Sequence, residues 1–230
     1  MFSITIDTEW VPQVMLDDVA EILNSYGIKA TFFVTNAYDF SKLKGHELAI
    51  HPNFEKNSNF DEILQKTISY LPSKTTKGTR SHKKYQTSDL IETYHNFGIE
   101  YDSNYYLPNY EKPLPFFHDH SSILEIPFVF MDYQFSTFPN FDLDEINLND
   151  SGVKVFDFHP SHVYMNTRSL DEYENIKQNY HDMDYLNSVK NSEKPGNRNI
   201  FFKILDFIEQ NNIEHKTMVE INNLFRSNSI

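Results

Sequence analysis

Two carboxylates stand two residues apart near the start of the chain, directly after a short alternating segment. Residues 3–6 alternate hydroxyl and isoleucine side chains, which is typical of a strand, and Asp7 and Glu9 follow. Side chains two apart on a strand point to the same side, so both carboxylates can converge on one point. Like charges held that close raise the pKa of one carboxyl unless a cation lies between them. The pair therefore indicates a divalent metal site, with a strand that runs into an acidic loop as the alternative.

Histidines and an arginine stand at the ends of three further predicted strands. They are His51 after residues 48–50, Arg80 and His82 at the end of residues 75–82, and His159 and His162 after residues 153–158. Neutral imidazole and carboxylate oxygens suit zinc or a related first-row ion, with one position left open for water. Structural roles are the alternative. His51 could be a hydrogen-bonded residue at a strand end, Arg80 could neutralise nearby acids, and His159 and His162 could hold a loop together.

Alternating strands and helices must position these residues. Apolar patterns predict strands at residues 3–6, 29–35, 45–51, 75–82, 100–105, 123–130 and 153–159. Helical patterns cover residues 16–26, 59–71, 88–97, 199–210 and 219–226. This order predicts an α/β fold of parallel strands joined by right-handed crossovers. Ligands in such folds gather at the carboxyl ends of the strands, where the polar residues above and Asp102 stand.

We expect residues 1–230 to form a single domain, because no linker, repeat or low-complexity tract divides the chain. Residues 106–122 are predicted to be irregular, with His118 and His120 as solvated loop residues rather than a second metal site. Residues 167–195 are polar and weakly periodic, so we expect a mobile insertion with partial helix.

The composition is that of an acidic globular protein without cysteine. The net charge of −13 argues against a nucleic-acid partner, and 39% hydrophobic residues suffice for a core. The absence of cysteine excludes disulfides and cysteine-ligated zinc, so histidine and carboxylate must hold any metal. No apolar run approaches the roughly 18 residues that span a bilayer, and no secretion signal precedes the first strand. We therefore expect a soluble, cytoplasmic protein, although the lack of cysteine is equally compatible with export in a processed form.

Several of these segments, in this order, resemble the motifs of the polysaccharide deacetylases, the NodB-homology domains of carbohydrate esterase family 4. The matching segments are residues 3–10, 29–34, 45–52, 80–82, 124–127 and 158–160. The sequences His-Pro-Asn-Phe and His-Pro-Ser-His most resemble the WbmS-like branch, which is associated with surface polysaccharide biosynthesis. The resemblance implies a distorted or incomplete (β/α) barrel. It also implies a divalent metal, usually zinc, and hydrolysis of an N-acetyl group on an amino sugar.

Carried over residue by residue, the resemblance implies a catalytic base and two metal ligands, with one departure. Asp7 matches the base, and His51 matches the first metal-binding histidine. The adjacent metal-binding aspartate of the family falls on Thr8, which cannot replace it, so we expect Glu9 as the substitute ligand.

The third metal ligand is a second departure from the family pattern. The second histidine of the motif is expected four residues after the first, where this chain has Glu55. Glu55, Asn53 or His82 could complete the set. We expect His82, because it needs no rearrangement of the loop.

The resemblance also implies the roles of Arg80 and His159. Arg80 matches the arginine that orients the base, and His159 matches the late histidine that protonates the departing amine. Trp10, His162 and Tyr105 are expected to contact an N-acetylated sugar or glycan substrate.

The leading hypothesis is a metal-dependent carbohydrate N-deacetylase acting on a nucleotide- or lipid-linked amino sugar or a short glycan. An amidohydrolase acting on a small non-sugar amide is the second hypothesis. The third is a degenerate domain of the same fold that binds a glycan or a partner without turnover, which the departures at Thr8 and Glu55 motivate.

Overall fold

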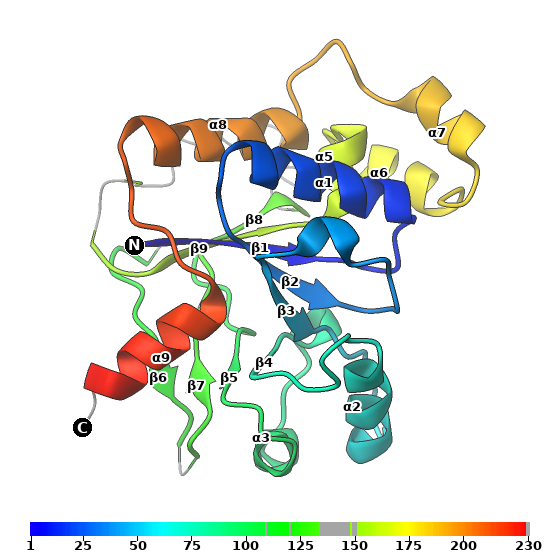
Figure 1. The fold of residues 1–230 in the computed structure, drawn as a ribbon. Helices are drawn as coiled ribbons and strands as arrows, with labels where there is room; N and C mark the ends of the chain where they lie inside the picture. The colour runs from blue at the N-terminus through cyan, green and yellow to red at the C-terminus, as the bar shows by residue number, and fades with distance from the viewer. Residues whose placement is uncertain (109, 120, 134–147, 149–150, 229–230) are drawn as a thin grey trace.

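One mixed sheet organises the molecule. The structure is a computed structural model that describes residues 1–108, 110–119, 121–133, 148 and 151–228. Within these residues the strands form a single sheet in the order β6-β7-β5-β4-β3-β2-β1-β9-β8. The strands are β1 (Phe2–Asp7), β2 (Thr31–Val34), β3 (Glu47–Ile50), β4 (Gly78–Thr79), β5 (Tyr101–Asp102), β6 (Phe116–Phe117), β7 (Leu124–Glu125), β8 (Phe130–Met131) and β9 (Lys154–Phe158). The sheet curls into a half-barrel (Figure 1).

Neighbouring strands are parallel, except that β6 runs antiparallel to β7. Strand β1 lies between β2 and β9, with Thr5 opposite both Thr31 and Asp157. The parallel arrangement brings the carboxyl ends of these strands to one edge of the sheet. The α/β class and the incomplete-barrel prediction are therefore confirmed.

Helices join the strands and cover the sheet. They are α1 (Gln13–Ser25), η1 (Ser41–Leu43), α2 (Phe60–Ser69), η2 (His82–Lys84), α3 (Ser88–Asn96), α5 (Pro160–Met165), α6 (Leu170–Lys177), α7 (Met183–Val189), α8 (Asn197–Gln210) and α9 (Met218–Asn228). Asn59, Thr87 and Ser169 cap α2, α3 and α6 by accepting a hydrogen bond from a first-turn backbone N–H. None of the described helices is both long and apolar enough to cross a membrane.

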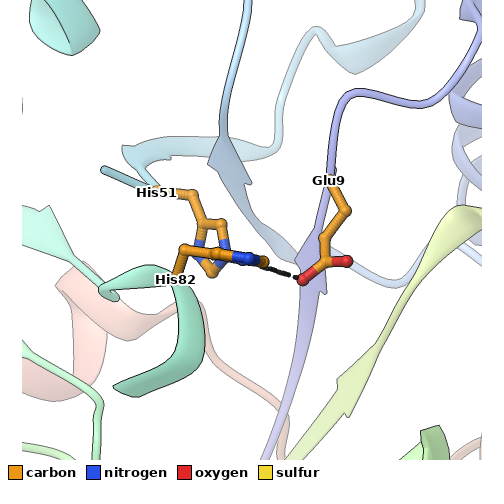
Figure 2. A group of neighbouring side chains, drawn as sticks. All are labelled: Glu9, His51 and His82. Atoms are coloured by element: carbon orange, nitrogen blue, oxygen red, sulfur yellow. Dashed lines mark ion pairs between the residues drawn. The ribbon is translucent and has the colours of Figure 1, made fainter. Parts of the chain in front are cut away.

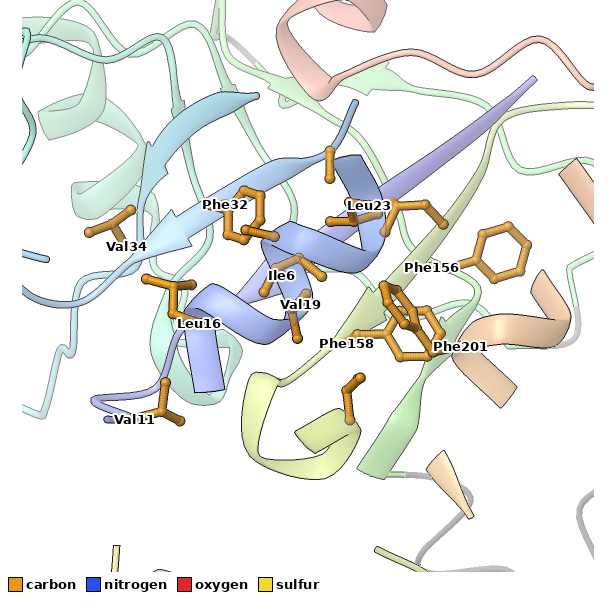
Figure 3. Close-up of a cluster of buried hydrophobic side chains, with 14 of the residues drawn as sticks. Ile6, Val11, Leu16, Val19, Leu23, Phe32, Val34, Phe156, Phe158 and Phe201 are labelled. Atoms are coloured by element: carbon orange, nitrogen blue, oxygen red, sulfur yellow. The ribbon is translucent and has the colours of Figure 1, made fainter. Parts of the chain in front are cut away.

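The main core lies between the central strands and helices α1, α5 and α8. Strand β1 is buried along its whole length, and Ile4 and Ile6 are fully inaccessible. Side chains of α1, β2 and β9 interdigitate above it, as Figure 3 shows. The rings of Phe158 and Phe201 lie 4.8 Å apart and join β9 to α8. Burial of each such side chain stabilises the fold by about 1.5–3 kcal/mol, which fixes the central strands that carry the polar residues.

The structure differs from the predicted elements at residues 75–82, where β4 covers only Gly78–Thr79 and His82 begins η2, and in the second half of the chain. The single strand predicted at residues 123–130 is wrong: Pro127 separates β7 from β8, because proline cannot donate a ladder hydrogen bond. The segment predicted to be irregular contains β6, and helix α5 begins at Pro160, where no helix was predicted. Proline is favourable at the first position of a helix because the N–H it lacks has no intrahelical partner there. The polar segment 167–195 contains α6 and α7.

Candidate active site

The predicted polar residues meet in one pocket at the carboxyl ends of the central strands. Asp7 ends β1, His51 follows β3, Arg80 follows β4 and His159 follows β9. These residues line a cavity of about 270 Å³ together with Glu9, His82, Asp157, His162 and Tyr173. The parallel neighbours β1 and β9 thus bring together Asp7 and His159, which are 152 positions apart in the chain.

Glu9, His51 and His82 form a group of potential metal ligands. One carboxylate oxygen of Glu9 lies 3.1 Å from Nδ1 of His82 and 3.9 Å from Nε2 of His51 (Figure 2). One ligand atom from each residue lies within 4.8 Å of the others. Two imidazoles and a carboxylate are a known ligand set of catalytic zinc, which leaves a position for water or substrate.

His51 is buried without the hydrogen bonds that such a group requires. Its side chain is 2% exposed, and neither ring nitrogen has a hydrogen-bond partner in the described part of the chain. An unsatisfied buried polar group costs about 1–3 kcal/mol, and a metal ion would satisfy it. Burial lowers the pKa of His51, which favours the neutral imidazole that binds metal. The residues present therefore fit a zinc ion.

A left-handed turn, rather than strand alternation, brings Glu9 to the group. Strand β1 ends at Asp7, and Glu9 and Trp10 have φ angles of 39° and 56°. Thr35 fixes the turn: its hydroxyl lies 3.0 Å from the Thr8 hydroxyl and accepts a 3.0 Å hydrogen bond from the Trp10 backbone N–H. Thr8 therefore stabilises the turn. The prediction that Asp7 and Glu9 lie two apart on one strand is wrong, because β1 ends at Asp7. Strained backbone of this kind is often found at functional sites.

Asp7 is held by a buried arginine. Arg80 donates a 3.0 Å hydrogen bond to Asp7 and also bonds Asp157, while its Nε donates to the backbone carbonyl of Ser103 at 2.9 Å. Although burial alone raises the pKa of Asp7, the Arg80 guanidinium brings it below its ordinary value. Burial raises the pKa of Asp157 to about 8 despite the same guanidinium. Asp7 is thus the ionised carboxylate of the pair, as a general base requires.

His159 is held in its protonated form by Asp132. Its Nδ1 lies 2.7 Å from one Asp132 oxygen, and its backbone N–H donates to the other at 2.7 Å. Its Nε2 lies 3.6 Å from Glu9 and faces the metal-ligand group. Burial alone lowers the pKa of His159, but Asp132 and Glu9 raise it well above its ordinary value. A positioned imidazolium at this point can donate a proton.

The site also contains three residues that were not predicted from the sequence: Asp132, Asp157 and Tyr173. Asp157 is an acid between two phenylalanines of a buried strand, and this pattern could have indicated it. Asp132 lies just after β8 and Tyr173 on α6, where no pattern marks either residue. The Tyr173 hydroxyl donates a 3.4 Å hydrogen bond to Glu9.

The predicted substrate residues lie in three different places. His162 lines the pocket, where its ring stacks on Tyr173 at 4.4 Å. Trp10 is 37% exposed and meets the His82 ring edge-on at 5.1 Å, beside a hollow formed by residues 177–184. Tyr105 lies outside the pocket and packs against Phe116 at 5.6 Å. A substrate role for each remains a prediction.

The alternative third ligands lie outside the metal-ligand group. Asn53 and Glu55 are exposed, and neither lines the pocket. His82, on η2, has its ring 5.5 Å from that of His51 and faces Glu9 (Figure 2), and its role as the third ligand stays a prediction.

A second cluster of histidine and carboxylates lies around β5 and β7. Nε2 of His118 is 2.8 Å from Asp102 and 3.5 Å from Glu125. The side chain of His118 is 11% exposed, so its prediction as a solvated loop residue is wrong. His120 lies outside the described residues. Burial alone lowers the pKa of His118, but hydrogen bonds with the two carboxylates raise it to about 9.

Comparison with known proteins identifies the family. The family model of the WbmS-like polysaccharide deacetylases matches residues 4–177. A Bordetella bronchiseptica structure described as a polysaccharide deacetylase involved in O-antigen biosynthesis is 26% identical, with a TM-score of 0.79 and 90% of each chain covered. No curated protein matches the chain.

Two more distant structures share the fold. A family 4 acetyl xylan esterase from Clostridium thermocellum, in complex with a cobalt ion, is 14% identical with a TM-score of 0.50 and covers 97% and 90% of the two chains. A carbohydrate esterase family 4 pseudoenzyme from Bacillus anthracis is 14% identical with a TM-score of 0.54, covering 96% of this chain and 65% of the other. The family match over most of the chain, supported by the shared fold, shows that this protein belongs to the WbmS-like polysaccharide deacetylases.

Proposed function

We propose that the protein is a metal-dependent hydrolase that removes an N-acetyl group from an amino sugar or glycan precursor in surface polysaccharide biosynthesis. The observation that carries the proposal is the convergence of Glu9, His51 and His82 between an ionised Asp7 and a protonated His159. The family supports carbohydrate deacetylation, and the description of the Bordetella structure supports a role in O-antigen biosynthesis.

Glu9, His51 and His82 would hold the ion, most simply zinc. A bound zinc ion polarises a carbonyl and makes its water more acidic, from a pKa of 15.7 towards about 7. Asp7, kept ionised by Arg80, accepts the proton of the attacking water. His159, oriented by Asp132, donates its proton to the departing amine. Water and the amide thereby give acetate and the free amino sugar.

The direct test measures bound metal and acetate release from N-acetylated amino sugars. Wild-type protein should bind about one zinc ion and release acetate. Asp7→Asn should keep the ion and lose about 10²–10⁴-fold in rate, the range typical of a general base. His51→Ala should lose both metal and activity, and His95→Ala, at an exposed histidine of α3, should lose neither. Acetate release that survives both site substitutions would refute the mechanism.

The same test decides between an enzyme and a non-catalytic domain. Thr8 and Glu55 depart from the family pattern, but the Thr8 hydroxyl contacts Thr35 in the turn that presents Glu9, and Nδ1 of His82 lies 3.1 Å from Glu9, which supports an enzyme. Folded wild-type protein that remains metal-free in saturating zinc would favour a binding domain without turnover.

A further inference from the structure

The rim of the active-site pocket has the opposite charge balance to the whole chain. The chain carries 33 acidic and 20 basic residues, yet three lysines line this pocket: Lys83, Lys84 and Lys177. All three are exposed, and Glu174 is the acid on the same rim. No ion pair joins any of these lysines to a carboxylate in the described part of the chain.

Local structure holds two of the lysines over aromatic rings. The ammonium nitrogen of Lys84 lies 5.9 Å from the Tyr106 ring, and that of Lys177 lies 5.6 Å from the Tyr173 ring. A ring face attracts an ammonium group without neutralising its charge. Tyr173 also donates a hydrogen bond to Glu9, which places Lys177 beside the metal-ligand group.

The turn that carries Lys83 and Lys84 adopts an unfavourable backbone. Lys83 and Lys84 have φ angles of 56° and 57°, in the left-handed region that residues with a side chain rarely adopt in succession. A hydrogen bond of 2.9 Å from the Lys84 backbone N–H to the carbonyl of Ser81 closes the turn. The same short element begins with His82, so the turn presents a potential metal ligand and two cations to one pocket.

Acids deeper in the pocket do not cancel this positive rim. Asp7 and Asp157 share the guanidinium of Arg80. Glu9 faces His82 and His159. The exposed ammonium groups therefore remain available to a ligand that enters from solvent.

We propose that the pocket takes an anionic amino sugar, with its acetamido group between Asp7 and His159. Its phosphate or carboxylate would lie against Lys83, Lys84 and Lys177. This inference rests on the proposed deacetylase function and narrows its substrate class. A phosphate would come from a nucleoside diphosphate carrier, and a carboxylate from a uronic acid ring.

Kinetics with three probes test the proposal. Acetate release is compared for free N-acetylglucosamine, its UDP-linked form and 2-acetamido-2-deoxyglucuronic acid. We expect at least one anionic probe to have about 10-fold higher kcat/KM, and the advantage to fall as salt rises and screens the charges. The triple variant Lys83→Gln, Lys84→Gln and Lys177→Gln should lose that advantage through KM. Lys66→Gln, at an exposed lysine of α2, should keep it.

The outcomes distinguish a phosphate from a carboxylate ligand. They also distinguish failure of the anion subsite from failure of the deacetylase function. Preference for the UDP-linked probe identifies phosphate, and preference for the uronic acid identifies carboxylate. Equal kcat/KM for the neutral and anionic probes, or a preference that survives in the triple variant, would overturn the anion subsite while leaving the deacetylase function intact.

Ligand binding, measured without turnover, tests the anion subsite independently of catalysis. Calorimetric titration of UDP and of glucuronate into Asp7→Asn protein, with EDTA present so that chelation plays no part, needs no catalysis. The three lysine substitutions should weaken at least one affinity about 10-fold, and Lys66→Gln should weaken neither. If no probe is hydrolysed but this difference is found, the deacetylase function fails and the anion subsite stands. Affinities that are unchanged by the three substitutions would overturn the subsite.

Discussion

Of the clusters of histidine and carboxylate that the described residues form beside the sheet, two differ in protonation. Glu9, His51 and His82 contribute two imidazoles and one carboxylate, and burial lowers the pKa of His51. The second cluster has one imidazole, that of His118, between two carboxylates that raise its pKa to about 9. A protonated imidazole neutralises its own surroundings, whereas a neutral and unpartnered one leaves a place for an external cation. Ligand chemistry, more than proximity alone, therefore distinguishes a metal site from an internal ion pair.

The largest difference should be between the two clusters when one histidine is removed from each and zinc binding and acetate release are compared. His51→Ala should abolish stoichiometric zinc binding and lower acetate release by more than about 10³-fold, because it removes a ligand from the proposed centre. His118→Ala should keep the zinc and most of the activity. Elemental analysis of dialysed protein measures the metal. Loss of zinc from His118→Ala but not from His51→Ala would reverse the assignment of the two clusters.

The next largest difference should be in kcat, when each of the two carboxylates that share Arg80 is replaced. Asp7→Asn removes an ionised base and should lower kcat by about 10²–10⁴-fold. Asp157→Asn replaces a group that burial holds mainly neutral at pH 7, so its amide can still accept from Arg80 and the loss should stay below about 10-fold. Steady-state kinetics of zinc-loaded protein measure both. Equal losses would show that Asp157 shares the role of the base.

The His118 cluster should contribute a smaller, pH-dependent stability. Because the folded-state pKa of His118 lies above its ordinary value of 6.5, its contribution is fully present below about pH 6.5 and lost as the pH rises through about 9. His118→Gln should therefore destabilise the protein by about 1–2 kcal/mol near pH 6, after allowance for solvent screening, and by little near pH 10.

Urea unfolding at the two pH values measures this difference. His95→Gln, at an exposed histidine of α3 that bonds Ser122, provides the matched control and should show no comparable pH dependence. A His118→Gln penalty that grows with pH would contradict a protonated imidazole between the carboxylates.

The parts of the site that follow apolar strands were predictable from the sequence. Asp7, His51 and His159 each end or follow a run of buried residues, and parallel strands must bring such positions to one edge. The alternation of strand and helix patterns likewise predicted the α/β class. The motif resemblance indicated a third ligand near Glu55, and His82, at the end of the predicted strand 75–82, was expected because it needs no rearrangement of the loop.

The other features of the site and the fold depend on contacts between distant segments, which local sequence patterns do not encode. Glu9 reaches the group through a left-handed turn fixed by Thr35, 26 positions away. Asp132 becomes the partner of His159 only after β8 pairs with β9. The split of the strand predicted at residues 123–130 likewise follows from two different pairing partners, β5 for β7 and β9 for β8.

A zinc-soaked crystal structure, with the ion located by its anomalous scattering, tests the central claim most directly. We expect an ion about 2.0–2.2 Å from one ligand atom each of Glu9, His51 and His82, with a further position open beside Asp7. An ion bound only by Asp102, His118 and Glu125, or one held by Glu55 in place of His82, would contradict it.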